Sequence, residues 1–207
     1  AAQSQRFGSN SREVIELIIA RNRTLSEGMG RSIILEKDLN IAEDLIKRME
    51  LPEDPAEAVT VWKDALREAI ADWNRAHGIP LPDLKAIETD RPFHSVTYCF
   101  PNYFTLPAYG NMASYRIRPL GPEKCLFEIW GLTLFPEGSE RPPLTTPVPM
   151  DCRDPRLPTI PGQDFSNLPL QQRGLHTSGF EFMRLSDGVE GLISNYQRLI
   201  DGYLAQL

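Results

Sequence analysis

Three histidines and one aspartate are the residues of this 207-residue chain best suited to bind a metal ion. The histidines, His77, His94 and His176, are far apart, and no two lie at a close helical spacing. Asp164 follows a proline-rich stretch. A mononuclear iron that activates dioxygen commonly uses two imidazoles and one carboxylate, with open positions for oxygen and substrate. Asp164 is the carboxylate that we consider for such a site, although a helix N-cap is the commoner reason for an aspartate in such a place.

The three histidines have different surroundings. His77 directly follows the clearest helical pattern, so we interpret it as a C-terminal cap or a solvent-exposed residue. His94 opens the first expected strand, where an inward side chain would face a cavity, although a structural histidine is the simpler interpretation. His176 follows the polar run 171–175 and is a candidate for a hydrogen bond near the site. A metal triad of His94, His176 and Asp164 is one hypothesis that these residues leave open.

The sequence gives little support for disulfides, for metal binding by cysteines or for a catalytic cysteine or serine. Cys99, Cys125 and Cys152 are far apart and odd in number, which argues against a disulfide framework and favours a reducing cytoplasm. No CxxC or CxH spacing is present, so the chain cannot build a structural zinc site or an iron–sulfur cluster from its cysteines. We expect these thiols to be buried and inert. There is also no GxSxG elbow and no glycine-rich phosphate loop.

Composition narrows the class of protein. The net charge of -6 and the pI near 5.2 argue against binding to nucleic acid or to an anionic membrane. No apolar run approaches the roughly 20 residues of a membrane-spanning helix, and the polar residues 1–10 do not resemble a signal peptide. The hydrophobic content of 41% is ordinary for a globular protein, and we expect residues 1–207 to form one domain.

Helical periodicity dominates the first half. Apolar residues recur at helical spacing in 14–19, after Ser11 as a candidate cap, and again in 39–49. The clearest helix is predicted from Pro55 to Ala76, because proline suits the first turn and Gly78 is a suitable stop. Its expected core face consists of Val59, Trp62, Leu66, Ile70 and Trp73.

The second half predicts a sheet followed by a helix. Strands are expected at 95–106, 113–120 and 125–135, rich in β-branched and aromatic residues and joined by short links as in an antiparallel meander. Nine prolines between Pro136 and Pro169 predict a long loop. Ser186 or Asp187 would then cap a closing amphipathic helix. Its expected apolar face consists of Val189, Leu192, Ile193, Tyr196, Leu199, Ile200, Tyr203 and Leu204.

These elements predict an α+β fold in which an antiparallel sheet wraps against a long C-terminal helix. An apolar cavity between sheet and helix would be a natural small-molecule site.

Four segments, in order, resemble the α subunits of Rieske non-haem iron oxygenases, which hydroxylate aromatic rings. Asp164, Asn167 and Gln172, followed by Arg173-Gly174-Leu175, resemble the segment that supplies the carboxylate ligand of the catalytic iron. The other three segments are the Pro-Asn step in 100–102, the hairpin in 115–130 and the closing helix in 185–204. The resemblance covers about residues 90–207 and is loose before them.

The resemblance implies a helix-grip catalytic domain of a dioxygenase or monooxygenase of aromatic hydrocarbon catabolism, with Asp164 as a ligand of Fe(II). It also implies a [2Fe-2S] cluster that receives electrons from NAD(P)H through a reductase or ferredoxin. The expected substrates are dioxygen and a small aromatic or other apolar compound, and the expected assembly is a homotrimer. His94 and Asn102 would line the substrate pocket or its approach.

The chain departs from the family in two ways. The cysteines and histidines of the Rieske cluster and the close pair of iron-binding histidines are absent, so the chain resembles a piece that begins after that pair or a relative that has lost it. We therefore expect the isolated chain to be inactive and to bind ferrous iron weakly or not at all. A non-catalytic START-like module that binds small molecules is the alternative.

Overall fold

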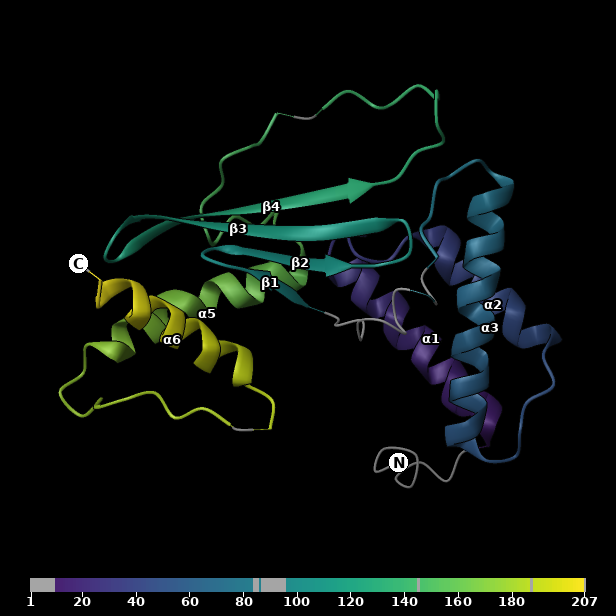
Figure 1. Cartoon of the computed structure of the whole chain (residues 1–207), viewed down its shortest axis with the longest axis horizontal. Coiled ribbons are helices and arrows are strands. Elements are labelled where there is room, and N and C mark those ends of the chain that lie inside the picture. Colours follow the sequence, from purple (N-terminus) through teal and green to yellow (C-terminus); the bar gives the residue numbers. More distant parts are fainter. Residues whose placement is uncertain (1–9, 84–85, 87–95, 145, 187, 207) are drawn as a thin grey trace.

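The computed structural model of the protein describes residues 10–83, 86, 96–144, 146–186 and 188–206. Within these residues, three helices come first, a four-stranded sheet follows, and two further helices close the chain (Figure 1). The predicted α+β class is therefore confirmed. No helix in the described ranges is long and apolar enough to cross a membrane.

The three N-terminal helices are α1 (Ser11–Gly28), α2 (Glu36–Arg48) and α3 (Pro55–Ala76). They pack against one another as a small bundle at one end of the molecule (Figure 1). The core of the bundle consists of Ile15, Ile19, Ala42, Ile46, Ala58 and Trp62. The predicted face of α3 is confirmed, because Trp62 and Ile70 are both buried and Val59 and Leu66 pack beside this core.

Side chains at the helix ends explain the boundaries of the bundle. Asp54 caps α3 by accepting hydrogen bonds from two backbone N–H groups, and Pro55 occupies the first turn as predicted. Gly78 ends this segment with a φ of 68°, a left-handed conformation that glycine adopts readily. The predicted cap of α1 is wrong by one residue. Asn10 accepts the bond from the backbone of Glu13, whereas the Ser11 hydroxyl donates to the Pro52 carbonyl at 2.7 Å.

The sheet is an antiparallel meander in the order β1-β2-β3-β4, as predicted. Its strands are β1 (Thr97–Cys99), β2 (Tyr103–Pro107), β3 (Asn111–Gly121) and β4 (Lys124–Thr133). The single strand expected over 95–106 is wrong, because a turn at residues 100–102 divides it into β1 and β2. Pro101, which lacks the N–H that a ladder position requires, lies in this turn.

The two faces of the sheet differ in character. Tyr115 pairs with Ile129, and both lie on the same face as Phe127, because alternate residues of a strand share a face. Arg118 and Glu128 lie on the other face, where they form an ion pair at 3.0 Å. Along β3, half-buried Tyr115 and Ile117 accordingly alternate with exposed Arg116 and Arg118.

Helix α5 (Thr159–Leu175) begins within the region that the prolines predicted to be a loop up to Pro169. That prediction is wrong for its last part. Pro161 falls in the first turn, where no intrahelical N–H bond is lost. Pro169 lies inside the helix and leaves the Phe165 carbonyl without its usual donor. Residues 136–144 and 146–158 do form the expected connection, without helix or strand.

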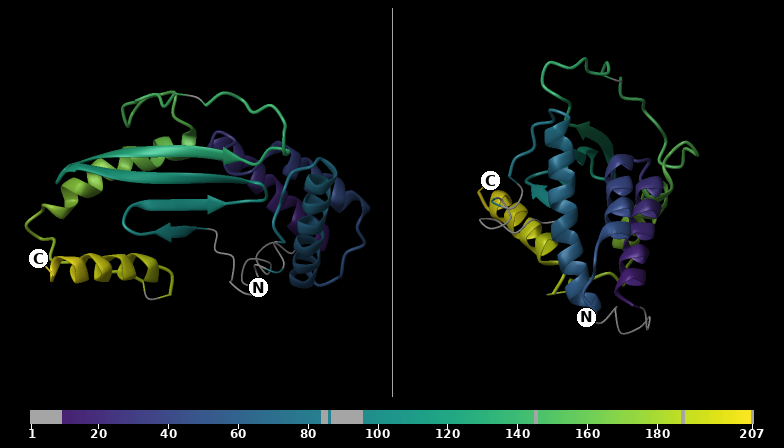
Figure 2. Two further views of the ribbon diagram at one scale, coloured as in Figure 1. Left: turned by 45° about the horizontal axis from the view of Figure 1, so that its top comes forward. Right: turned by 90° about the vertical axis from the view of Figure 1, so that its right-hand side faces the viewer.

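The closing helix, α6 (Gly191–Leu204), begins later than predicted. Its N-cap is Glu190, whose carboxylate accepts a bond from the Ser186 N–H, so Ser186 is not the cap. Asp187 lies outside the described residues. None of the residues of α6 is buried, and the helix lies beside β1 at the edge of the sheet rather than across it (Figure 2).

Aromatic rings make the contact between α6 and the sheet edge. Tyr196 packs edge-on against Tyr98 with ring centroids 5.4 Å apart, and Tyr203 stacks on Phe100 at 5.2 Å. Helix α5 lies on the same side of the sheet and contacts β4 through Phe165 and Phe127. Helix α5 thus lies against the face of β3 and β4, whereas α6 lies at the β1 edge. The helix-grip arrangement stays a prediction.

Candidate functional site

Asp164 lies inside α5, beyond its first turn. The N-cap of this helix is Pro158, and no side chain caps it by a hydrogen bond. The interpretation of Asp164 as a helix cap is therefore wrong, and its carboxylate is exposed to solvent. The sequence suggested a cap because aspartate is a preferred N-cap residue and the prolines hid the helix that begins at Thr159.

A hollow of about 280 Å³ lies between α5 and the strands β3 and β4, and Asp164 is part of its wall. The sheet contributes Tyr115, Phe127 and Ile129, and the helix contributes Pro161, Asp164, Phe165, Asn167, Leu168 and Gln171. The helical residues share a face because they recur at three- and four-residue intervals.

Three aromatic rings form a continuous wall of this hollow. The ring of Phe127 lies 5.5 Å from that of Tyr115 and 4.8 Å from that of Phe165, centroid to centroid. These are ordinary separations for tilted aromatic pairs. Phe165 directly follows Asp164, so the ring packing fixes the part of the helix that carries the carboxylate.

The electrostatics of the hollow are set by one charge. Burial raises the pKa of Tyr115, and the negative charge of Asp164 raises it further. The Tyr115 hydroxyl therefore remains protonated at neutral pH, beside an ionised carboxylate. Among the described residues that line the hollow, Asp164 is the only one with a charged side chain at neutral pH.

The described residues do not complete a metal site. Among them, no group of three histidine, cysteine, aspartate or glutamate side chains is placed to hold an ion. His176 lies twelve positions after Asp164 on the same helix, roughly 18 Å along its axis. These two residues cannot share one metal ion, so the triad of His94, His176 and Asp164 does not form. Asp164 fits one position of a site with two histidines and one carboxylate.

The other histidines have structural roles. His77 is the C-cap of α3, as predicted, and its ring stacks on Trp73 at 3.7 Å. His176 is the C-cap of α5, and its Nε2 lies 2.9 Å from a carboxylate oxygen of Glu123 in the turn between β3 and β4. The other oxygen of Glu123 accepts a bond from Gln172 at 3.1 Å. His176 therefore joins the end of α5 to this turn and lies away from the hollow.

Asn102 and His94 were the expected pocket residues. Asn102 lies in the turn between β1 and β2, where its carbonyl accepts a bond from the Ile117 N–H at 2.9 Å. It is not among the residues that line the hollow beside Asp164. His94 lies outside the described residues.

The expectation of buried cysteines is wrong. Cys99, Cys125 and Cys152 are all exposed and free. Cys99 ends the short edge strand β1, Cys125 lies next to the turn that opens β4, and Cys152 lies in the proline-rich connection. Each position is at the periphery of its element, which an apolar sequence context does not reveal.

Sequence reasoning missed several residues of the hollow. Tyr115, Phe127 and Phe165 were assigned to elements but not to a common site. Helical spacing from Asp164 would have indicated Asn167 and Gln171 as neighbours on one face, had the segment been interpreted as a helix from Thr159. Because the prolines predicted a loop, the helical spacing of these residues was not considered.

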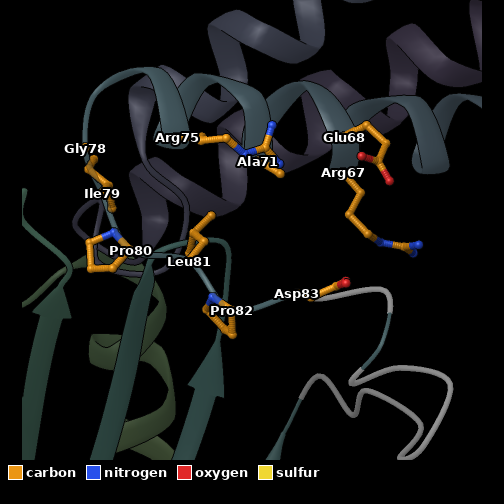
Figure 3. Close-up of a pocket in the computed structure, with 10 residues that line it drawn as sticks. All are labelled: Arg67, Glu68, Ala71, Arg75, Gly78, Ile79, Pro80, Leu81, Pro82 and Asp83. Carbon is orange, nitrogen blue, oxygen red and sulfur yellow. The ribbon is translucent and has the colours of Figure 1, made fainter.

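A second hollow, of about 460 Å³, lies at the C-terminal end of α3 (Figure 3). Figure 3 shows Arg67, Glu68 and Arg75 on the helix and Asp83 on the segment that follows it. Arg75 forms an ion pair with Asp72 on the same helix. This hollow does not include Asp164, and its charged wall offers less apolar surface to an organic ligand.

The family model described as ring hydroxylating alpha subunit (catalytic domain) matches residues 38–206. The match reaches from α2 to the end of α6 and thus begins well before residue 90, where the sequence resemblance became clear. No curated protein and no solved structure matches the chain.

Proposed function

Because the chain belongs to the family of ring-hydroxylating alpha-subunit catalytic domains, we propose that it forms part of an oxygenase in which Asp164 is one ligand of a mononuclear non-haem iron. The observation that carries this proposal is the position of Asp164. An exposed carboxylate, which caps no helix, lies in the wall of an aromatic-lined hollow. A carboxylate that binds a catalytic metal ion must be accessible to that ion and must lie next to the pocket that holds the organic substrate.

The described residues supply only part of the ligand set that an iron ion needs. Asp164 supplies one oxygen ligand of the two-histidine, one-carboxylate type. The described residues place no imidazole beside it, so this part of the chain alone should bind ferrous iron weakly at most. When bound by its full ligand set, the iron would activate dioxygen, with electrons from NAD(P)H delivered through a reductase or ferredoxin and a Rieske [2Fe-2S] cluster.

The residues of this chain would hold the substrate. Phe127, Ile129 and Phe165 provide an apolar wall that excludes water from one side of a small organic molecule. The half-buried Tyr115 side chain provides a neutral hydroxyl in the same wall. We propose hydroxylation of an aromatic or other apolar compound, by insertion of one or two oxygen atoms.

Further proposals concern the organisation of the protein. We propose that residues 1–207 form one domain, which the packing of Met29 and Ile33 against Ala113 of the sheet supports. We also propose that the enzyme works in the cytoplasm as a homotrimer. His94 and Asn102 are proposed to line the approach to the substrate, beyond the hollow described above.

The test is an Asp164→Asn variant of the intact enzyme. Asparagine keeps the size of the side chain but removes the negative charge that the ferrous site needs. We expect the variant to melt like the wild type, to keep its Rieske cluster and to lose most of its catalytic iron and oxygen-coupled turnover. Iron analysis, turnover and melting curves measure these three outcomes.

Asp201→Asn is the matched control, since Asp201 is an exposed carboxylate on α6. It should keep both iron and turnover. An Asp164→Asn enzyme that is active and fully loaded with iron would overturn the proposal. Loss of iron from both variants would show that the effect is not specific to Asp164.

A further inference from the structure

Helix α5 consists of two parts that are held in place differently. Pro169 lies inside the helix, so the Phe165 carbonyl lacks its usual hydrogen-bond donor. Before Pro169, the ring of Phe165 packs against Phe127 of β4, and Ile160 packs on the buried cluster that includes Ala113. A proline inside a helix is a common cause of a kink or hinge. The two parts of α5 can therefore move relative to each other at Pro169.

The part of α5 beyond Pro169 has no buried apolar anchor. Leu170 and Leu175 are 54% and 41% exposed, and none of the residues 170–175 is buried. Gly174 weakens the last turn further, because glycine has a low helix propensity. A side chain at this position would meet open space, since no atom beyond the adjacent residues and the helix backbone lies within 4 Å of where its Cβ would be. Apolar packing therefore neither holds this part nor requires the glycine.

Polar contacts with one carboxylate hold this part instead. Glu123, in the turn between β3 and β4, accepts a hydrogen bond from the Gln172 side chain at 3.1 Å, and its other carboxylate oxygen lies 2.9 Å from His176 Nε2. The Glu123 and His176 side chains are 57% and 62% exposed. Exposed polar pairs of this kind contribute little to stability. The contact is therefore weak enough to open and close while the rest of the domain stays folded.

The chain that follows this part leaves it free to move. Residues 176–186 and 188–190, between α5 and α6, form neither helix nor strand. Gln171 of the same part belongs to the wall of the hollow, together with Leu168 on the other side of Pro169. A movement at Pro169 would therefore carry Gln171 out of the wall and open this end of the hollow.

We propose that residues 170–176 form a gate at one end of the hollow, with Pro169 as its hinge and Glu123 as the residue that holds it closed. In the closed state, the two contacts of Glu123 keep Gln171 in the wall. Loss of these contacts releases the gate, while the part of α5 before Pro169 stays packed on the sheet. The inference goes beyond the proposed oxygenase function, because this movement needs neither iron nor substrate.

The experiment is hydrogen–deuterium exchange of the intact protein, with mass spectrometry of the segments 162–168 and 171–177, because amide exchange measures local opening. Glu123→Ala removes the acceptor of both contacts, so exchange in 171–177 should become about three- to tenfold faster. Exchange in 162–168 should change less than about twofold, since the contact between the aromatic rings is retained. Gly174→Ala should slow exchange in 171–177 about three- to fivefold, because alanine favours the helix.

Two control variants separate loss of the hydrogen bonds from general damage to the turn. Glu123→Gln keeps an acceptor oxygen and adds an amide that can pair with Gln172, so exchange in both segments should stay within about twofold of the wild type. Lys124→Ala changes the exposed residue next to Glu123 and should leave exchange in both segments unchanged.

Unchanged exchange of 171–177 in Glu123→Ala would overturn the inference. Equal acceleration of both segments would also overturn it, because α5 would then move as one body. An effect of the same size in Lys124→Ala would do so as well. These measurements use neither iron nor turnover, so failure of the gate is distinct from failure of the proposed oxygenase, which the iron content of Asp164→Asn decides.

Discussion

The helical bundle and the sheet with its two covering helices are built in different ways. In the bundle, large side chains are completely enclosed, with Ile15 0% and Trp62 1% exposed. In the second region, α6 has no buried residue and α5 has only Pro161. The bundle therefore contains most of the tightly packed core, whereas the candidate site lies where packing is open.

This difference separates stability from function within one chain. A closed core offers no space for a substrate, because protein interiors are packed as densely as organic crystals. The hollow beside Asp164 exists because α5 meets the sheet through a few aromatic rings rather than along its whole length. Substitutions should accordingly affect unfolding most strongly in the bundle and ligand binding most strongly at α5.

The largest expected effect is on the bundle. Trp62→Ala should lower the free energy of unfolding by about 3–5 kcal/mol, because it leaves a cavity in the core formed with Ile15, Ile46 and Ala58. Denaturant unfolding measures the loss. Val61→Ala, at a neighbouring position that is 40% exposed, should change stability by less than about 0.5 kcal/mol. A loss below about 1 kcal/mol for Trp62→Ala would mean that the bundle is not the stable region.

A smaller effect is expected on the closing helix. Leu199 belongs to the apolar face that was expected to pack against the sheet, where Leu199→Ala would cost roughly 2–5 kcal/mol if the side chain were fully buried. Since Leu199 is 37% exposed, we expect a loss below about 1 kcal/mol, measured by the same unfolding experiment. A loss above about 2 kcal/mol would show that α6 is packed as tightly as the bundle and would remove the contrast between the two regions.

The smallest effect concerns a buried carboxylate of the bundle. Asp38 is only 6% exposed, and burial raises its pKa, while a hydrogen bond from Lys37 at 2.7 Å opposes this shift. The folded chain thus binds this proton more tightly than the unfolded chain. The contribution of Asp38 to stability is therefore present below its unfolded pKa and is lost as the pH rises through its folded pKa.

Asp38→Asn removes this ionisation. The stability of the wild type relative to Asp38→Asn should therefore fall as the pH rises from about 4 to 7. Melting temperatures of both proteins over this range measure the trend. If the stability of the wild type relative to Asp38→Asn rose with pH instead, the hydrogen bond from Lys37 would outweigh the effect of burial on the pKa of Asp38.

The bundle was the most predictable part of the fold. The helical repeat of Val59, Trp62, Leu66 and Ile70, together with Pro55 and Gly78, indicated α3 from start to end. Local signals suffice there because the helix is long and its end residues have strong conformational preferences.

The sheet and its helices were less predictable because non-local packing decides their limits. Pro101 divides one apolar run into β1 and β2, although the residues on both sides favour strands. Pro161 and Pro169 suggested a loop, but the face of α5 that meets Phe127 keeps the segment helical. The contact between Phe127 and Phe165 joins residues far apart in sequence, which periodicity alone cannot reveal.

The candidate site was predicted in part. Asp164 was selected as the carboxylate from its resemblance to a family motif, and family membership is confirmed. Its role as a ligand stays a prediction, as do the pocket roles of His94 and Asn102. The aromatic wall opposite Asp164 could not be predicted, because it depends on how α5 lies on β3 and β4.

Iron binding at Asp164 is tested most directly by a crystal structure of the intact, iron-loaded enzyme with data collected at the iron absorption edge. We expect one anomalous peak within bonding distance of an Asp164 carboxylate oxygen, with two histidine nitrogens completing the set of protein ligands. An iron peak whose protein ligands are all supplied by other residues, with the Asp164 carboxylate out of bonding distance, would contradict the assignment of Asp164 as the ligand.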